Sequence, residues 1–578
     1  MSAAPADVRK PPQPPQPSGN IMASHALASC FFCRRSKRRC DKNLPTCQLC
    51  IKKGLKCSYP RRRGQRAASP PSGVRGSESG DDSNSAHAEP VVAQSSNASE
   101  FQPVSPTSTS SFAVNAAISF LAPDLFREAG LEIPRLDLGI PDEVSLHLGD
   151  SQQVLETASK FFQMTWMPIV SRKRHLAAVL NPLSPCRRPT VLLHLCMKLC
   201  CLPVDDEKRT SLYRLIKKFY SEVESTGDLC VQVLQAAILI AVFEIGDAIY
   251  PAAYLTVGGC SRYAIAMGLD KINKCRLGGE HTRTASWMEI EEKRRVWWAI
   301  LTLDRSVTSI QFTLLVIAIR GDRAPIDAFY RFLNFTNPAR VLATEDPVFE
   351  DFLPVDDDKF YDATSEPEDA VPISQGFVFK IGHFGRLAQA TYLISQALAT
   401  IRSFSAVSTD LSKTSLLSET AQLCRTFEAL ARANEVEVTV RRLPFCCQSL
   451  ISYSGVFLLQ EHYWQQLNMR SRQDTQQDTY VETHHALDTL CRVASGIQQG
   501  PSPVDLRQGH CTFLLVGVVY QGLSALLSIG NGNPSAEIRE SIAVLRWLLR
   551  HLRARWPLSG IYERILDSKE ALLASEVI

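Results

Sequence analysis

The chain has 578 residues, of which 45% are hydrophobic and 21% are charged, and its formal net charge is +4. This is the composition of a globular protein with room for two or more folding units, and it excludes a protein that is basic throughout. No apolar secretory segment opens the chain, so we expect its 18 cysteines in a reducing compartment rather than in disulfides.

Residues 1–28 are polar and proline-rich, and we expect them to be disordered. A strongly basic block follows them. From Cys30 to Arg66 there are thirteen lysines or arginines and one acid, Asp41, so the remainder of the chain is net acidic. Such a local excess of positive charge indicates a polyanion as the partner.

Six cysteines lie in this block as two equally spaced C-x2-C-x6-C sets: Cys30, Cys33 and Cys40, then Cys47, Cys50 and Cys57. In a reducing compartment such sets indicate metal, and zinc is the usual tetrahedral ion for thiolates. Two closed tetrahedral sites need eight ligand bonds, which six sulfurs supply only if one cysteine of each set bridges. The alternative is a single zinc on Cys30, Cys33, Cys47 and Cys50, with the other two cysteines as core thiols.

The full spacing, together with the basic run CRRSKRRC, resembles the fungal binuclear zinc cluster DNA-binding domain. The resemblance implies a zinc-organised module of two short helices at residues 29–60 that binds two Zn²⁺ ions. It also implies that Cys30 and Cys47 are the bridging ligands. One zinc would then be held by Cys30, Cys33, Cys40 and Cys47, and the other by Cys47, Cys50, Cys57 and Cys30.

The basic side chains between the cysteines are candidates for DNA binding. We expect those between Cys33 and Cys40 to lie on a short helix that can reach phosphates and base edges in a major groove. The resemblance places Lys37 where family members carry the lysine that reads a CGG triplet. Its neighbours would hold phosphates: Arg34, Arg35, Arg38 and Arg39. Arg61, Arg62 and Arg63 begin a basic tail that would contact phosphates, serve as a nuclear import signal, or remain a solvated run of charge.

Residues 61–110 comprise this basic tail and a linker rich in serine, proline and glycine, which we expect to be flexible. The linker shows no sustained heptads, whereas the family often dimerises through a coiled coil just after the cluster. A homodimer of this chain would therefore form through the region that follows the linker.

Residues 111–578 show apolar residues at three- and four-residue steps, which predicts an all-α domain of more than ten helices. The most apolar run, LQAAILIAVF at 234–243, is too short to span a bilayer and is expected to be a buried helix, so no membrane partner is expected. Segments 166–175, 254–271 and 289–307 resemble, in the right order, the fungal-specific transcription factor domain. The resemblance implies a regulatory rather than an enzymatic domain.

Some segments of this domain leave alternatives open. The acidic-aromatic run at 345–362 is either a surface loop or an activation segment. Residues 311–340 depart from the family pattern and are interpreted as an insertion or a retained intron. The close pairs Cys196 and Cys200, Cys446 and Cys447, and His484 and His485 are expected to be buried thiols and satisfied histidines rather than a site.

These features predict a nuclear, sequence-specific DNA-binding transcription factor for RNA polymerase II genes, which binds CGG-containing double-stranded DNA and the transcription machinery. The family further implies control of a metabolic or secondary-metabolite gene cluster. The competing classes are an RNA-binding protein and an enzyme with an accessory zinc module. The lack of stacking aromatics in the basic run opposes the first, and the lack of a recognisable catalytic set opposes the second.

Overall fold

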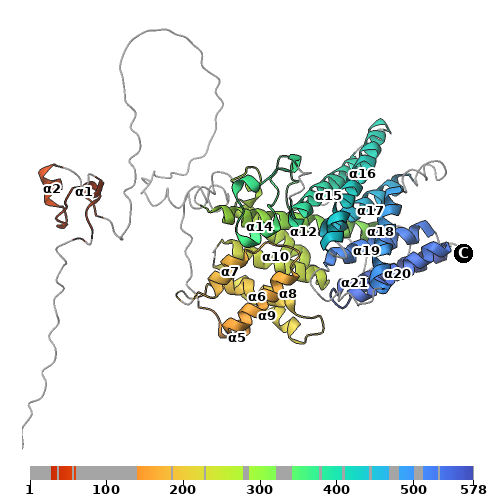
Figure 1. Cartoon of the computed structure of the whole chain (residues 1–578), viewed down its shortest axis with the longest axis horizontal. Helices are drawn as coiled ribbons and strands as arrows, with labels where there is room; N and C mark the ends of the chain where they lie inside the picture. Colours follow the sequence, from red (N-terminus) through yellow and green to blue (C-terminus); the bar gives the residue numbers. More distant parts are fainter. Residues whose placement is uncertain are drawn as a thin grey trace, which may run out of the picture. The chain divides into compact units, whose positions relative to one another are not determined.

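The computed structural model divides the chain into two compact units, residues 1–103 and 104–578, which are treated separately below (Figure 1). The described residues are 26, 28–35, 38–54, 57–59, 139–181, 183, 186–226, 229–277, 285–319, 342–375, 381–406, 410–441, 446–467, 481–499, 512–530 and 534–576. Of the N-terminus predicted to be disordered, residues 26 and 28 are described, and the N–H of Ala26 donates to the carbonyl oxygen of Lys42 (2.8 Å). The rest of that segment and the predicted linker, residues 61–110, lie outside the described residues.

The first unit contains the cysteine module, with two one-turn helices, α1 (Phe31–Arg35) and α2 (Gln48–Lys52). The predicted pair of short helices is thus confirmed. The sulfur of Cys47 caps α2 by accepting a hydrogen bond from the N–H of Cys50. Each helix begins directly after a cysteine of the same small core, since Cys30 precedes α1 and Cys47 precedes α2.

Helices make up the second unit. Its first half contains α5 (Asp142–Leu148), α6 (Ser151–Met164), α7 (Arg172–Val179), α8 (Arg188–Cys201), α9 (Lys208–Ser225), α10 (Val231–Gly246), α11 (Ala252–Ala266), η1 (Leu269–Lys271) and α12 (Trp287–Ile319). Its second half contains α14 (Asp357–Asp362), η3 (Pro367–Asp369), η4 (Ile373–Gln375), α15 (His383–Ala406), α16 (Asp410–Arg441), α17 (Cys447–Leu467), α18 (Val481–Gln499), α19 (Phe513–Gly530), α20 (Ala536–Leu552) and α21 (Leu558–Glu576). No β-strand occurs in the described part of the unit, and the predicted all-α domain is confirmed.

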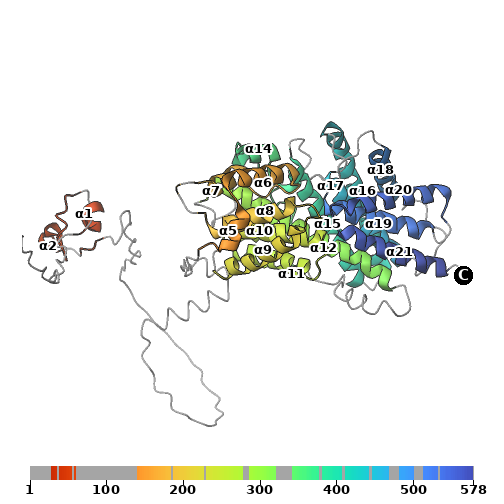
Figure 2. The same cartoon turned by 90° about the horizontal axis from the view of Figure 1, so that it is seen from below.

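Two helices that are apolar all round occupy the interior, because a helix without a polar face must bury its whole circumference. Every residue of α10 except Gln232 is buried, and the helix packs against α8, α9, α11 and α12 (Figure 2). This confirms the buried helix predicted at 234–243. α19 is long and apolar enough to cross a bilayer, yet 83% of it is buried against helices such as α17, α20 and α21. It is therefore a core helix of this unit.

α12 carries charged side chains into the interior. Arg295 is fully buried and donates to Glu291 (Nε to Oε1, 2.9 Å) and to Asp357 (Nη1 to Oδ1, 2.8 Å). Its remaining N–H groups reach the carbonyl oxygens of Val355 (2.6 Å) and Pro168 (3.3 Å). The guanidinium therefore joins α12 to the loop after α6 and to the chain around α14.

The acidic-aromatic run at 345–362 is part of this packing. Leu353 and Phe360 are fully buried, and Asp351 is 3% exposed. The N–H of Val355 donates to the Glu291 carboxylate (2.9 Å). A segment held in this way is a structural part of the domain, which favours the loop interpretation over an activation segment.

The two flanks of segment 311–340 lie together. Thr344 donates through its N–H (3.1 Å) and its hydroxyl (2.7 Å) to the Asp304 carboxylate, and Arg305 pairs with Asp346 (2.9 Å). α12 covers the first residues of the segment, and its later residues lie outside the described chain. Because the two flanks contact each other, the chain between them can leave the domain and return to it at the same place. The interpretation of the segment as an insertion or a retained intron stays a prediction.

Candidate zinc centre and nucleic-acid interface

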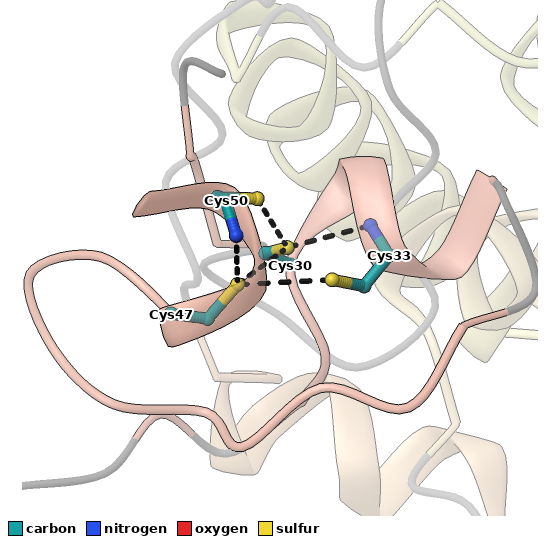
Figure 3. Close-up of side chains that lie close together, drawn as sticks. All are labelled: Cys30, Cys33, Cys47 and Cys50. Atoms are coloured by element: carbon teal, nitrogen blue, oxygen red, sulfur yellow. Dashed lines mark hydrogen bonds between the residues drawn. The ribbon is translucent and has the colours of Figure 1, made fainter. Parts of the chain in front are cut away.

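Four cysteine sulfurs converge at the centre of the first unit (Figure 3). The sulfur of Cys30 lies 3.8 Å from those of Cys47 and Cys50, and the sulfur of Cys33 lies 3.7 Å from that of Cys47. A tetrahedral zinc with Zn–S bonds of about 2.3 Å separates its sulfurs by about 3.8 Å. All four side chains are fully buried. The spacing and the chemistry of these donors therefore fit zinc.

The two halves of the module repeat the same local geometry. In the first half, the N–H of Cys33 donates to the sulfur of Cys30 (3.4 Å). In the second, the N–H of Cys50 donates to the sulfur of Cys47 (3.4 Å). The first cysteine of each set thus occupies an equivalent position, with an N–H aimed at its sulfur. Such hydrogen bonds stabilise a thiolate, which is the form that binds metal.

The remaining two cysteines lie at the edge of this core. Cys40 and Cys57 are half-buried and pack against the four buried thiols. The ligand atom of Cys40 lies within 4.8 Å of that of Cys47, and the sulfur of Cys57 accepts from the N–H of Cys47 (3.5 Å). Cys47 therefore contacts members of both sets, as a bridging ligand must. This geometry supports the bridged assignment, which stays a prediction for the individual residues.

The directions in which the thiol pKa values shift indicate which cysteines ionise readily when no metal ion is bound. Burial raises the pKa of Cys50 to about 12, and burial also raises the pKa values of Cys30 and Cys33. For Cys47, burial is outweighed by hydrogen bonds from the N–H of Cys50 and from neighbouring thiols, and its pKa is lowered to about 6. These hydrogen bonds therefore favour the thiolate form at Cys47, whereas burial opposes it at the other three cysteines. Zinc supplies the charge that deprotonates all of them.

Two residues that were not predicted to belong to the site, Asp41 and Tyr59, support the loops of the module. The Asp41 carboxylate accepts from the N–H of Gln48 (3.1 Å) and from the side-chain amide of Asn43 (2.9 Å). The Tyr59 hydroxyl donates to the carbonyl oxygen of Asn43 (2.7 Å). Asp41 is the one acid among thirteen cations in the block, and that isolation was the available sign of a structural role.

The structure corrects the placement of the basic run. α1 is described over Phe31–Arg35, and Arg38 and Arg39 lie outside a helix. The N–H of Arg38 donates to the carbonyl oxygen of Cys33 (2.9 Å), five residues back instead of the four of an α-helix.

The described cations of the module face solvent. Arg34, Arg38 and Arg39 are exposed in the first half, as are Lys52 and Lys53 in the second. The side chain of Arg35, and all of Lys37, Arg61, Arg62 and Arg63, lie outside the described residues. The described surface is basic, because these exposed cations outnumber its one acid, Asp41.

Comparison with known families matches two segments of the chain. The fungal Zn(2)-Cys(6) binuclear cluster domain matches residues 28–66. The fungal specific transcription factor domain matches residues 159–312. The second match ends at the beginning of segment 311–340.

The chain also resembles individual proteins. Transcription factor BOA15 of Botryotinia fuckeliana (strain B05.10) is 40% identical over 157 residues, which are 26% of this chain and 84% of that protein. An uncharacterized transcriptional regulatory protein of Schizosaccharomyces pombe is 20% identical over 310 residues, 51% of this chain and 39% of the relative. The thiamine biosynthesis regulatory protein of Saccharomyces cerevisiae is 58% identical over 36 residues, 6% of this chain and 8% of the relative. The chain thus spans less than two thirds of the last two relatives.

These matches agree with the geometry. A domain of this type binds two zinc ions, and its cysteines supply the sulfur cluster described above. Zinc cluster transcription factors bind DNA, and the exposed cations of the module suit that partner. The chain belongs to the fungal Zn(2)-Cys(6) binuclear cluster transcription factors, and a fungal specific transcription factor domain follows its cluster.

Proposed function

We propose that this chain is a nuclear, sequence-specific DNA-binding regulator of genes transcribed by RNA polymerase II, without catalytic activity of its own. The observation that carries the proposal is the zinc-compatible sulfur cluster beneath a basic surface. Zinc replaces an apolar core in a module this small, so the outer positions are free to carry cations. Those cations suit the phosphates of double-stranded DNA.

Within the module, residues 29–60, Cys30 and Cys47 bridge two zinc ions. Cys33 and Cys40 complete the first site, and Cys50 and Cys57 complete the second. The approach of Cys40 to Cys47, and the hydrogen bond from the N–H of Cys47 to the sulfur of Cys57, support this division over a single zinc, because they bring the two outer cysteines to the cluster. The sulfurs act as structural ligands, and the site keeps no open position for chemistry.

Lys37 reads the bases of a CGG triplet, and the neighbouring arginines position the module. Guanine presents two acceptors, O6 and N7, in the major groove, and a lysine ammonium can donate to both. The arginines hold phosphates and fix the register without reading sequence: Arg34, Arg35, Arg38, Arg39, Arg61, Arg62 and Arg63. The exposure of Arg34, Arg38 and Arg39 supports this role.

Base contact and phosphate contact can be distinguished by measuring the affinity of the full chain for a CGG duplex and for a scrambled duplex at several salt concentrations. Lys37→Ala is expected to cost about 1–3 kcal/mol on the CGG duplex and much less on the scrambled one, because it removes base contacts. Arg38→Ala is expected to weaken binding to both duplexes alike. It should also flatten the dependence of log K on log salt by about one unit, because one phosphate contact is lost.

Lys53→Ala is the matched control, since Lys53 is an exposed lysine of the other half. Its loss should leave the preference for CGG unchanged. If Lys37→Ala lowers affinity equally for both duplexes, Lys37 is one more phosphate contact, and specificity lies in the backbone or in DNA shape.

The helical region, residues 111–578, serves as the regulatory domain in this proposal. It forms any homodimer, because the linker at 61–110 lacks heptads, and it contacts the transcription machinery. The basic tail from Arg61 also directs the chain to the nucleus. A metabolic or secondary-metabolite gene cluster is the proposed target, a view supported by the relative named for thiamine biosynthesis.

A further inference from the structure

Two adjoining cavities lie in the helical unit, where α6, α8 and α10 meet the turn between α20 and α21. The small cavity, of about 40 Å³, is lined by Arg209, Phe243 and Trp556, among others. The large cavity, of about 470 Å³, opens beside it. Both are lined by Arg555 and Met164. A volume of 470 Å³ lies within the range of small-molecule sites.

The small cavity holds a buried guanidinium with unused donors. Arg209 is 4% exposed, and one of its nitrogens, Nη2, pairs with Asp247. Its Nε and Nη1 groups are buried without a hydrogen-bond partner. The guanidinium carbon of Arg209 lies 4.7 Å from the centre of the Phe243 ring. Buried N–H donors are almost always satisfied in proteins, so these two point to an acceptor that enters from the cavity.

A second guanidinium lines both cavities. Arg555 donates from Nη2 to the carbonyl oxygen of Cys200 (2.8 Å), and its Nε is buried without a partner. Its charge acts on Arg209: burial lowers the pKa of Arg209, Asp247 raises it, and Arg555 lowers it again. Two guanidinium groups therefore face one carboxylate in an apolar setting. The lining of the small cavity includes both cations and no acid, so an anion bound there would balance the guanidinium charge that Asp247 leaves uncompensated.

The rest of the small cavity is apolar. Phe161, Trp166, Leu239 and Trp556 contribute to its wall. The Trp556 ring packs so closely on Gly246, at the end of α10, that a Cβ at this position would collide with it. The rim of the large cavity carries charges of both signs, from Lys160, Asp205 and Asp206. Beside these charges, the large cavity has an apolar lining from Met164, Leu202 and Pro203. Guanidinium groups at the small cavity and an apolar lining in the large one favour a ligand with one anionic group and an apolar body.

We infer that these cavities bind a small organic monocarboxylate, whose carboxylate accepts hydrogen bonds from Arg209 and Arg555 and whose apolar body lies along Met164 in the large cavity. The site belongs to the helical unit and uses no residue of the zinc module. It is therefore independent of the proposed DNA-binding function.

The test uses the full chain and two probes of the same shape, 2-naphthoate and its neutral amide, 2-naphthamide, in calorimetric titrations near pH 7. The wild-type chain is expected to bind naphthoate about tenfold to a hundredfold more tightly than naphthamide, because only the carboxylate brings an anion to the two guanidinium groups, whereas the amide offers them a neutral carbonyl oxygen. Arg555→Met should reduce that ratio by about tenfold, because it weakens naphthoate more than naphthamide.

Two further variants locate the binding. Arg553→Met removes an exposed arginine two residues away and should keep the ratio. Ala554→Trp places a large ring at an exposed residue that lines the large cavity, and should weaken both probes. A thermal melt shows whether Arg555→Met is folded. The results for Ala554→Trp and for the two probes on the wild-type chain do not depend on the folding of Arg555→Met.

The inference is overturned if the wild-type chain binds naphthoate no more tightly than naphthamide, or if both bind with Kd above about 1 mM. It is equally overturned if Arg553→Met lowers the ratio as much as Arg555→Met does. Unchanged affinity of both probes for Ala554→Trp would place their binding outside these cavities and would also overturn it.

Discussion

Cys47→Ala is expected to remove both zinc ions from the N-terminal module and to abolish DNA binding. Cys47 lies at the meeting point of the two cysteine sets, 3.7 Å from the sulfur of Cys33 and 3.8 Å from that of Cys30. A bridging sulfur supplies one bond to each metal, so its loss opens both sites. Because metal binding supplies the folding free energy of such a module, the basic surface would lose its shape. Cys30→Ala, the equivalent change in the first set, is expected to act in the same way.

Cys40→Ala is the comparison that distinguishes bridging from terminal ligands. Cys40 lies at the edge of the cluster, so its loss removes one bond to one metal and should release less zinc than either bridging variant. Zinc per chain, measured by elemental analysis of the purified full chain, checks the series. Cys186→Ala, a half-buried thiol of the helical unit, should retain both ions.

The single-zinc alternative makes a different prediction for the same series. It expects one zinc in the wild-type chain and the same content in Cys40→Ala, since Cys40 would be a spare core thiol. Equal retention of one zinc by the Cys30, Cys40 and Cys47 variants would contradict the bridged assignment.

The largest expected effect on the helical unit comes from Arg295→Met. This change should lower the free energy of unfolding by about 3–5 kcal/mol, because it leaves the Asp357 carboxylate without its counter-charge and leaves Glu291 paired with Arg294 alone. Arg295 is fully buried between Glu291 and Asp357. Arg295 also donates to the carbonyl oxygen of Val355, and the substitution would remove this hydrogen bond.

Urea unfolding followed by tryptophan fluorescence measures the effect. Lys293→Met is the matched control, because Lys293 lies on the same helix two residues earlier and is half-buried. It should change stability by less than about 1 kcal/mol. An Arg295→Met chain with the unfolding midpoint of the control would show that the buried network does not hold α12 to the chain around α14.

The zinc centre was predictable because its determinants are local in sequence. The six cysteines lie within 28 residues, Cys30 to Cys57, and tetrahedral geometry restricts how they can meet. Even so, the spacing did not predict that Arg38 and Arg39 lie outside a helix. The hydrogen bond from the Arg38 N–H to the carbonyl oxygen of Cys33 belongs to the folded loop and does not follow from helix propensity.

In the helical unit, the periodicity of apolar residues predicted the fold class and the buried helix α10. It could not predict which charges are buried. Arg295 appears in the sequence as one of several charges in EEKRR, and its partners Asp357 and Pro168 lie 62 and 127 residues away. The cavity around Arg209 and Arg555 likewise draws on segments that meet through tertiary packing alone.

The central claim is that zinc organises a basic module that reads double-stranded DNA. It is tested most directly by fluorescence anisotropy of the full chain on a CGG duplex and a scrambled duplex, before and after zinc is removed by a chelator. We predict at least a tenfold preference, roughly, for the CGG duplex, its loss on chelation, and its return when zinc is restored. Equal affinity for the two duplexes, or a CGG preference that survives complete removal of zinc, would contradict the claim.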